Sequence, residues 1–385
     1  MIMKNRYYMI PSLAALTSCL LLGTACQADA EKTVPAKAPA APVAVQKSAC
    51  TIKLSAQTSF RKTANAQQKA IMGKQLTPEQ AKAMRAFDEK INTVNRNLIW
   101  KKMFNEADAE LKKLLAEKDQ EQALRSKIVL LMADNVSRKN DPALLVKEVD
   151  TLLKQYANVL TPADKAALYR YQAGAFDKQK KYCEKTKALY ARLGCAITEQ
   201  DAENTCNELI QAVWNAGKKA EAIALAKEFA DMAGADKKSA RISKLLYYAR
   251  MMKDAAVCKD ALAAYKKAEK DINKVANETI QVASAFRSQS MDFIPALQEI
   301  IANPAYAFRL RANALAEYMN SGAAKKKPAE IIDLANKHLF TVKDIPPADY
   351  TYLVYNVLLN HAARTMGRHD LAQQYCKSLL AYPQV

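Results

Sequence analysis

The chain has 385 residues, a formal net charge of +19 at neutral pH and only 8 glycines. The scarcity of glycine disfavours folds built on phosphate-binding loops or on many tight β-turns. Alanine, leucine, lysine and glutamine are abundant, and all four have high helix propensity. The composition predicts an all-α protein. The positive charge bears on its partners and not on its fold.

The first residues have the pattern of an export signal. Lys4 and Arg6 precede an apolar run over residues 7–23, and small residues follow it. A basic start, an apolar run and small residues are typical of a secretory signal peptide. Pro11 interrupts the run, which argues against a permanent membrane-spanning helix. We expect residues 1–25 to be removed during export.

Two processing sites overlap at the end of this signal. Residues 22–26 read LGTAC and resemble the lipobox of bacterial lipoproteins, in which the cysteine is acylated and becomes the first residue. Residues 28–30 read ADA and resemble the cleavage site of ordinary secretion. We favour the lipobox, because a segment rich in Ala and Pro follows it and has few bulky side chains to bury. The resemblance implies a palmitate-bearing lipid on Cys26, followed by a disordered linker over residues 26–55.

The residue after Cys26 bears on the destination of the protein. It is Gln27 and not an aspartate, and in the lipoproteins that the chain resembles this pattern implies the outer membrane. We therefore expect a protein anchored by its lipid to the bacterial outer membrane and facing the periplasm. Secretion without a lipid remains the alternative.

From residue 77 onward the chain repeats a turn, an apolar-periodic helix, a short break and a second helix. A proline at the first helical position marks five helix starts, since the N–H that proline lacks is unpaired there in any case. These starts are Thr77-Pro78, Asp141-Pro142, Thr161-Pro162, Lys327-Pro328 and Pro346-Pro347. The pattern predicts about eight helical hairpins over residues 77–383. Residues 56–76 are either a capping helix or loosely ordered.

Three stretches, residues 208–229, 244–270 and 358–380, share a finer pattern of small and apolar residues. The residues that carry it are Leu209, Gly217 and Ala222, then Ala249, Ala261, Leu262, Tyr265 and Ala268, then Leu359, Gly367 and Ala372. These units resemble tetratricopeptide (TPR) repeats, although their average step of about 38 residues exceeds the usual 34. The resemblance implies a right-handed superhelical solenoid whose first helices line a concave face. It implies nothing about a ligand.

The chain contains 8 cysteines. Six remain once Cys19 leaves with the signal peptide and Cys26 carries the lipid, and an even number in an exported protein permits disulfides. Cys195 and Cys206 are the closest pair, across a short loop between helices, and they are the disulfide that we expect. Buried thiols that pack as small apolar groups are the alternative.

The sequence offers few residues for chemistry. Its three histidines are His338, His361 and His369, and they occur outside any HExxH motif. The sequence also lacks a Cys-x-x-Cys pair, a Gly-x-Ser-x-Gly elbow and a glycine-rich phosphate loop. We therefore expect no catalytic residue, no cofactor and no metal site.

Basic residues interleaved with tyrosines form a candidate binding surface. Its members are Lys181, Tyr182, Lys185, Lys237, Lys238, Arg241, Lys244 and Tyr248. Such a pattern can serve single-stranded nucleic acid, but export disfavours that partner. An anionic polymer of the cell envelope fits the same charge.

These observations predict a membrane-anchored helical-repeat scaffold that binds proteins or peptides in the bacterial cell envelope, and not an enzyme. Two alternatives stay open. One is an all-helical α/α-toroid enzyme that acts on anionic polysaccharide. The other is a structural envelope protein that binds the cell wall through its charge.

Overall fold

The computed structural model describes residues 53–54, 77–117, 122–195, 198–287 and 293–382. Over these ranges the chain is helical and has no β-strand, so the expected all-α fold class is confirmed. None of the helices described there is both long enough and apolar enough to cross a bilayer. The expected signal peptide 1–25, Cys26 and the segment 56–76 lie outside the described residues. So does the expected linker 26–55, except for two residues.

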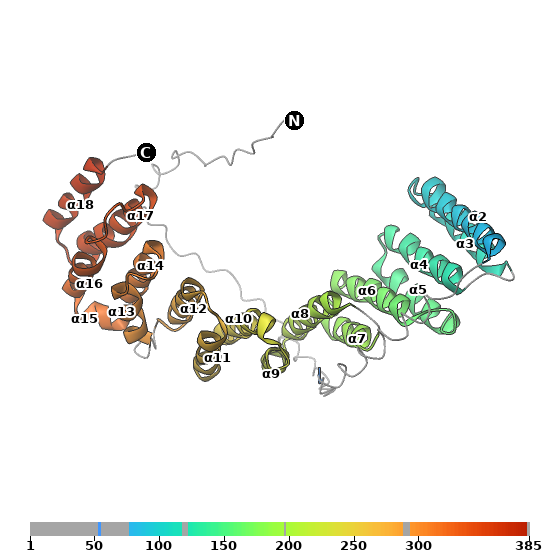
Figure 1. Cartoon of the computed structure of the whole chain (residues 1–385), viewed down its shortest axis with the longest axis horizontal. Coiled ribbons are helices and arrows are strands. Elements are labelled where there is room, and N and C mark those ends of the chain that lie inside the picture. Colours follow the sequence, from blue (N-terminus) through green and yellow to red (C-terminus); the bar gives the residue numbers. More distant parts are fainter. Residues whose placement is uncertain (1–52, 55–76, 118–121, 196–197, 288–292, 383–385) are drawn as a thin grey trace, which may run out of the picture. The chain divides into compact units, whose positions relative to one another are not determined.

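The helices follow one another in pairs (Figure 1). Each first helix contacts its second helix, and each second helix from α3 to α13 contacts the first helix of the next pair. The first helices are α2 (Pro78–Val94), α4 (Gln122–Arg138), α6 (Pro162–Lys178), α8 (Glu199–Asn215), α10 (Ala235–Met252), α12 (Ile272–Ala285) and α14 (Phe308–Met319). Their partners are α3 (Phe104–Ala116), α5 (Pro142–Gln155), α7 (Tyr182–Leu193), α9 (Lys219–Asp231), α11 (Ala255–Ala268), α13 (Ile294–Ala302) and α16 (Pro328–Leu334).

The remaining segments extend or join these helices. Wider π-helical turns continue α2 as η1 (Asn95–Ile99) and α16 as η3 (Ala335–Leu339), and the short α15 (Gly322–Lys326) lies between α14 and α16. The last pair consists of α17 (Pro347–Thr351), η4 (Tyr352–Leu359) and η5 (His361–Thr365), followed by α18 (His369–Ala381). First helices of neighbouring pairs also touch, as α2 does with α4 and α4 with α6. The architecture is therefore helical and repeat-like.

The five proline-marked helix starts are confirmed, because α2, α5, α6, α16 and α17 each begin at the expected proline. Asp141 caps α5, its carboxylate accepting hydrogen bonds from the backbone N–H groups of Ala143 and Leu144, each at 3.0 Å. Thr161 and Asp164 cap α6 reciprocally, each side chain accepting from the backbone of the other. These caps satisfy donors that a helix start leaves unpaired.

The turns within the pairs repeat one backbone conformation. One residue in each of six turns has the left-handed φ that ends many helices, and these residues are Lys102, Asn140, Lys180, Gly217, Lys253 and Gly367. The first five follow each other at intervals of 38, 40, 37 and 36 residues. The intervals agree with the average step expected from the sequence.

The turn residue Lys253 corrects the alignment of one unit. Gly217 stands five residues before Ala222, which is fully buried on α9. The same offset from Lys253 leads to Cys258, also fully buried, and not to Ala261, the small residue of the TPR-like pattern in this unit. Ala261 lies about one helical turn further along α11 and is buried on the same face. The turn was not recognised in the sequence because a lysine occupies it, and glycine is the usual signal for this conformation.

Replacing Lys253 with glycine should raise the free energy of unfolding by about 0.5–1 kcal/mol. The left-handed conformation costs an L-residue roughly 1–2 kcal/mol, and the entropy that glycine gains on unfolding offsets part of the relief. Chemical denaturation of both proteins measures the change. Lys253→Ala is the control and should bring no gain, since alanine keeps the Cβ. A loss of stability in Lys253→Gly would contradict the argument.

Residues Lys53 and Leu54 pack against the helical pairs. Leu54 is 2% exposed and belongs to a hydrophobic cluster that includes Leu189 and Leu193 of α7. The Tyr190 hydroxyl donates a hydrogen bond of 3.3 Å to the carbonyl of Lys53. The expected disordered linker 26–55 therefore contains two residues that are ordered on α7.

Among the described residues, the hydrophobic core consists of two clusters that both include residues of α6. Leu168 and Ala175 belong to the N-terminal cluster, which reaches back to Phe87 on α2. Ala173 belongs to the C-terminal cluster, which extends to Tyr375 on α18. Opposite faces of α6 therefore serve the two clusters, and the face toward α4 and α5 borders the pocket described next.

Candidate functional site

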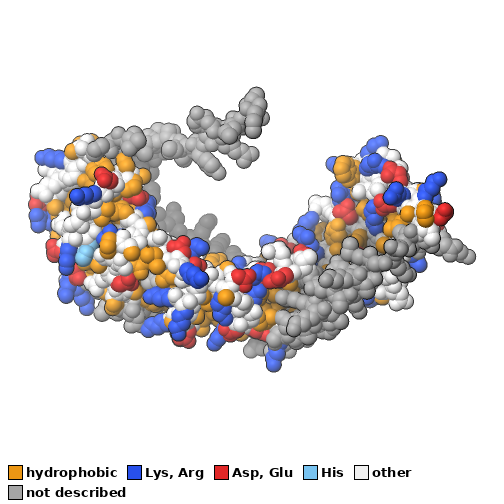
Figure 2. Space-filling view, viewed as in Figure 1, with side chains coloured by type: hydrophobic (Ala, Val, Ile, Leu, Met, Phe, Trp, Pro, Cys, Tyr) orange, Lys and Arg blue, Asp and Glu red, His pale blue; other side chains and the backbone are white. Residues whose placement is uncertain are grey.

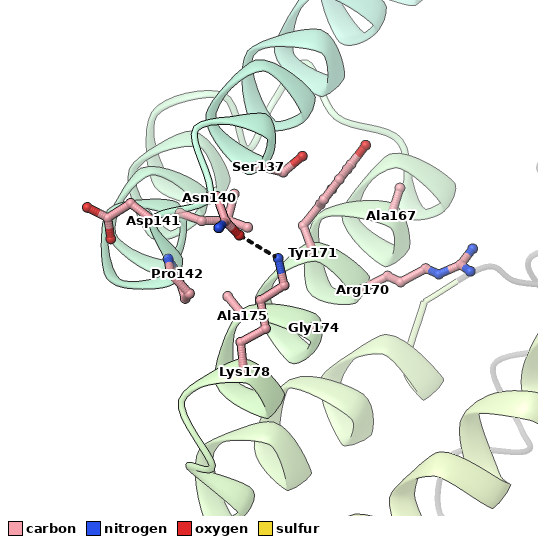
Figure 3. A pocket seen from close by; sticks show the side chains of 11 residues that line it. Ser137, Asn140, Asp141, Pro142, Ala167, Arg170, Tyr171, Gly174, Ala175 and Lys178 are labelled. Carbon is pink, nitrogen blue, oxygen red and sulfur yellow. Dashed lines mark hydrogen bonds between the residues drawn. The ribbon is translucent and has the colours of Figure 1, made fainter.

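A pocket of about 430 Å³ lies between the turn that joins α4 to α5 and one face of α6 (Figure 3). Apolar groups make most of its wall, with a few polar side chains among them. The lining residues are Ser137, Asn140, Asp141, Pro142, Leu145, Ala167, Arg170, Tyr171, Gly174, Ala175 and Lys178. A volume in this range suits a small ligand or one or two inserted side chains.

Local sequence explains both walls of the pocket. On one side α4 ends at Arg138, Asn140 takes the left-handed φ of 57°, and Asp141 starts α5. On the other side, residues 167, 170, 171, 174 and 178 are spaced three or four apart along α6 and so share one helix face. The pocket is thus built where a turn of one pair meets the first helix of the next.

Gly174 leaves this space open. It is exposed in the last turns of α6, and a Cβ built on it would meet no heavy atom within 4 Å. Its position lies six residues before the left-handed turn residue of its pair. The same position in the five other pairs with such a turn residue carries Arg96, Asp134, Gln211, Tyr247 and His361. The pocket therefore lies where the repeat lacks a side chain.

Two basic side chains, Arg170 and Lys178, border the pocket. Lys178 Nζ donates a hydrogen bond of 3.4 Å to Asn140 Oδ1, and neither Lys178 nor Arg170 forms an ion pair within the described part of the chain. Figure 3 shows Lys178 turned toward Asn140, while Arg170 extends the other way along the rim. The carboxylate of Asp141 is turned away from Lys178 and accepts the capping bonds of α5 (Figure 3).

Tyr171 forms an uncharged wall of the pocket. Its hydroxyl donates a hydrogen bond of 3.2 Å to Asp134 Oδ1 on α4. Burial, reinforced by the neighbouring Asp134 carboxylate, raises the pKa of Tyr171 to about 12. The phenol is therefore neutral at physiological pH and holds the two first helices α4 and α6 together.

The basic and aromatic surface expected from the sequence is divided between two helices. Lys181 and Tyr182 lie at the start of α7, where Lys185 forms an ion pair of 2.7 Å with Asp177. The other five residues lie on α10. On the face shown in Figure 2, Lys and Arg side chains are interspersed with acidic and apolar ones. The eight residues do not make one continuous basic patch.

On α10 most of these residues join helices to one another. Lys237 pairs with Glu199 of α8, and Lys238 donates a hydrogen bond of 2.8 Å to the carbonyl of Ala230. Lys244 Nζ lies 5.9 Å from the ring centroid of Tyr248. Their roles in helix packing explain the interleaved pattern without a ligand.

Arg241 and Tyr248 are buried, which corrects the expectation that they form a binding surface. Arg241 is 8% exposed and makes a two-pronged ion pair with Glu203 of α8. Tyr248 is fully buried, and its hydroxyl donates a hydrogen bond of 3.3 Å to Gln211 of α8. Sequence reasoning missed this burial, because both residue types are also common on surfaces.

The expected disulfide between Cys195 and Cys206 is not formed in this structure. Cys195 follows α7 as a free thiol whose Sγ donates to the carbonyl of Ala191 at 3.4 Å. Burial raises the pKa of this thiol to about 11. Cys206 is fully buried within α8, so the helix turns it into the core and away from the loop that suggested the bond.

The three histidines occupy unrelated places. His361 is buried in η5, His369 is exposed at the start of α18, and His338 lies in η3, where its backbone carbonyl accepts a bond from Arg311. Burial lowers the pKa of His338. Among the described residues, His, Cys, Asp and Glu side chains form no group of three or more arranged to hold a metal ion.

The fold and the pocket define an all-helical protein of repeat-like architecture. The sequence matches no protein-family model and has no detectable match among curated proteins. The pocket could have been suspected from one sequence signal, a glycine placed inside a helical pattern and not at a turn.

Proposed function

We propose that the protein is a membrane-anchored helical-repeat scaffold that binds proteins or peptides in the bacterial cell envelope. In this proposal the stacked pairs form a right-handed TPR-like solenoid, a lipid on Cys26 holds it to the outer membrane, and it faces the periplasm. Three observations support it: the sequential packing of the pairs, the repeated turns, and a start of the sequence that resembles an export signal with a lipobox.

The observation that carries the binding function is the pocket at Gly174. It lies between two neighbouring pairs and combines an apolar wall with two cations that lack an acidic partner in the described residues. Apolar contacts supply the favourable free energy of most associations, and unpaired charge at the rim steers and selects the partner. Such a surface suits binding better than it suits proton transfer or nucleophilic attack.

Site-specific photo-crosslinking in intact envelopes tests this function. A benzophenone amino acid would replace Arg170, Gln211 or Tyr247, which are exposed on three successive first helices. We expect a defined crosslinked partner from at least one of them. The control probe replaces Lys266, exposed on the second helix α11, and should yield no such product. Equal products from all four positions, or none from the three, would refute a scaffold that binds through its first helices.

The lipid anchor has its own test. Cys26→Ser should move the protein from the membrane to the soluble fraction, because the acylated thiol supplies the membrane affinity. Fractionation and the mass of the mature chain measure the change. Cys183→Ser, which alters an exposed cysteine of α7, is the control and should leave the protein in the membrane fraction. An unchanged mature mass in Cys26→Ser would show that the lipobox is not used.

A further inference from the structure

Among the described residues, two pairs contain a buried side chain that bonds to the start of the preceding second helix. His361 Nε2 donates a hydrogen bond of 2.8 Å to the carbonyl of Pro328, the first residue of α16. Asn135 Nδ2 donates one of 2.8 Å to the carbonyl of Phe104, the first residue of α3. His361 is 2% exposed and Asn135 is fully buried. In both places a planar N–H donor reaches the first carbonyl of a helix.

The pocket is the corresponding place between α5 and α6. Gly174 stands in the register of His361, and Ala175 in that of Asn135, so neither has a donor to offer. The first residue of α5 is Pro142, and within the described ranges no side chain donates to its carbonyl. Gly174 and Ala175 both line the pocket, and neither has a side chain that can reach the Pro142 carbonyl.

The charges around the pocket favour an anionic group beside that donor. Lys178 and Arg170 border it without an ion-pair partner in the described residues. The Asp141 carboxylate faces the N-terminus of α5, whose backbone N–H groups and dipole offset its charge. Asp134, behind Tyr171, is paired with Arg138 at 2.8 Å. A carboxylate near Lys178 would meet little repulsion.

We propose that this pocket binds a segment of a partner protein that inserts a planar side chain bearing an N–H group toward the Pro142 carbonyl and places a carboxylate near Lys178. The inserted group takes the role that His361 has at Pro328. The inference rests on the scaffold function proposed above and names the chemistry of what the scaffold binds at this point. The apolar wall formed by Leu145, Ala167 and Ala175 excludes water from the inserted ring.

N-acetyl-L-tryptophan is a suitable probe, since it combines an indole N–H with a carboxylate. Saturation-transfer NMR on the full-length protein measures its binding. N-acetyl-L-phenylalanine lacks the N–H donor, and N-acetyl-L-tryptophanamide lacks the charge, so both should bind about tenfold more weakly. Equal binding of all three would overturn the proposal. Failure of N-acetyl-L-tryptophan to bind would do so as well.

Variants of Gly174 test whether the probe binds in this pocket. Gly174→His copies the residue of the last pair and should abolish binding by filling the space, whereas Gly174→Ala leaves it open and should bind as wild type does. Lys178→Gln should remove the preference for the acid over the amide. Circular dichroism shows whether each variant is folded. If Gly174→His unfolds the helix, Gly174→Gln is a second variant that fills the space. Undiminished binding of the probe in a folded variant that fills the space would overturn the proposal for this pocket. The scaffold function would still be tested separately, by crosslinking from the other first helices.

Discussion

Replacing Arg311 with methionine is expected to lower the free energy of unfolding by about 2–4 kcal/mol. Arg311 is 4% exposed in α14, and its guanidinium donates from Nε to the carbonyl of Ile301 at 2.9 Å and from Nη2 to the carbonyl of His338. These carbonyls lie at the C-terminal ends of α13 and η3, where helix dipoles favour a cation. Burial lowers the pKa of Arg311, yet an arginine stays charged at any ordinary pH.

The size of the effect follows from the two bonds that are lost. Each hydrogen bond to a charged group contributes roughly 1.5–3 kcal/mol, and the relief from burying a cation offsets part of the loss. Arg311→Lys should recover only a fraction, because an ammonium cannot copy the planar fork of donors. Denaturant unfolding measures all the changes.

The matched control for Arg311 is an arginine two residues earlier on α14. Arg309 is exposed, pairs with Asp349 at 3.4 Å and lies over the ring of Tyr352. Arg309→Met should cost no more than about 1 kcal/mol, as is usual for exposed pairs. Similar losses for the two variants would contradict the view that Arg311 joins two helix ends.

The helical pairs were predictable because their signals are local. A proline after Asp141 or Thr161 starts a helix through the geometry of its own ring and through the cap before it, and neither depends on distant residues. The apolar period of each helix likewise reports which face is buried. The class of fold and the five proline-marked helix starts therefore follow from short stretches of sequence.

The candidate site was not predictable in the same way, because it depends on register between pairs. Gly174 opens a pocket because the turn at Asn140 lies opposite it. This alignment can be recognised only when the positions of the turn residues are known. Three of the turn residues are lysines, including Lys180 and Lys253, so the usual glycine signal is missing. The burial of Arg241 and Tyr248 was likewise set by neighbours about 38 residues away along the chain.

Hydrogen bonds between residues about 38 positions apart in the sequence also explain how the pocket keeps its shape. Tyr171 bonds to Asp134 across α6 and α4, and Lys178 on α6 reaches Asn140 in the turn between α4 and α5. Further along, Arg241 bonds to Glu203 and Tyr248 to Gln211 across α10 and α8. Such bonds fix one first helix against the next. Stability then accumulates from neighbour to neighbour, as in other repeat arrays.

The strongest of these connections yields the second large prediction. Glu203→Met should lower the free energy of unfolding by about 3–5 kcal/mol, because it leaves the guanidinium of Arg241 buried without its counter-charge. Glu203 Oε2 lies 2.6 Å from Arg241 Nη2 and both side chains are largely buried, at 17% and 8% exposed. Arg241 would keep only its bond of 2.9 Å to the carbonyl of Phe229 and its contact with the Phe229 ring.

A double-mutant cycle separates the pair from its surroundings. The double variant, Glu203→Met with Arg241→Met, buries two apolar side chains in place of two charges and should be more stable than Glu203→Met alone. Lys237→Met, at the pair with Glu199 on the same two helices, is the control and should change stability far less, because solvent screens an exposed pair. Additive losses from the two single changes would mean that Arg241 and Glu203 act independently, and the ion pair would then not be what joins α10 to α8.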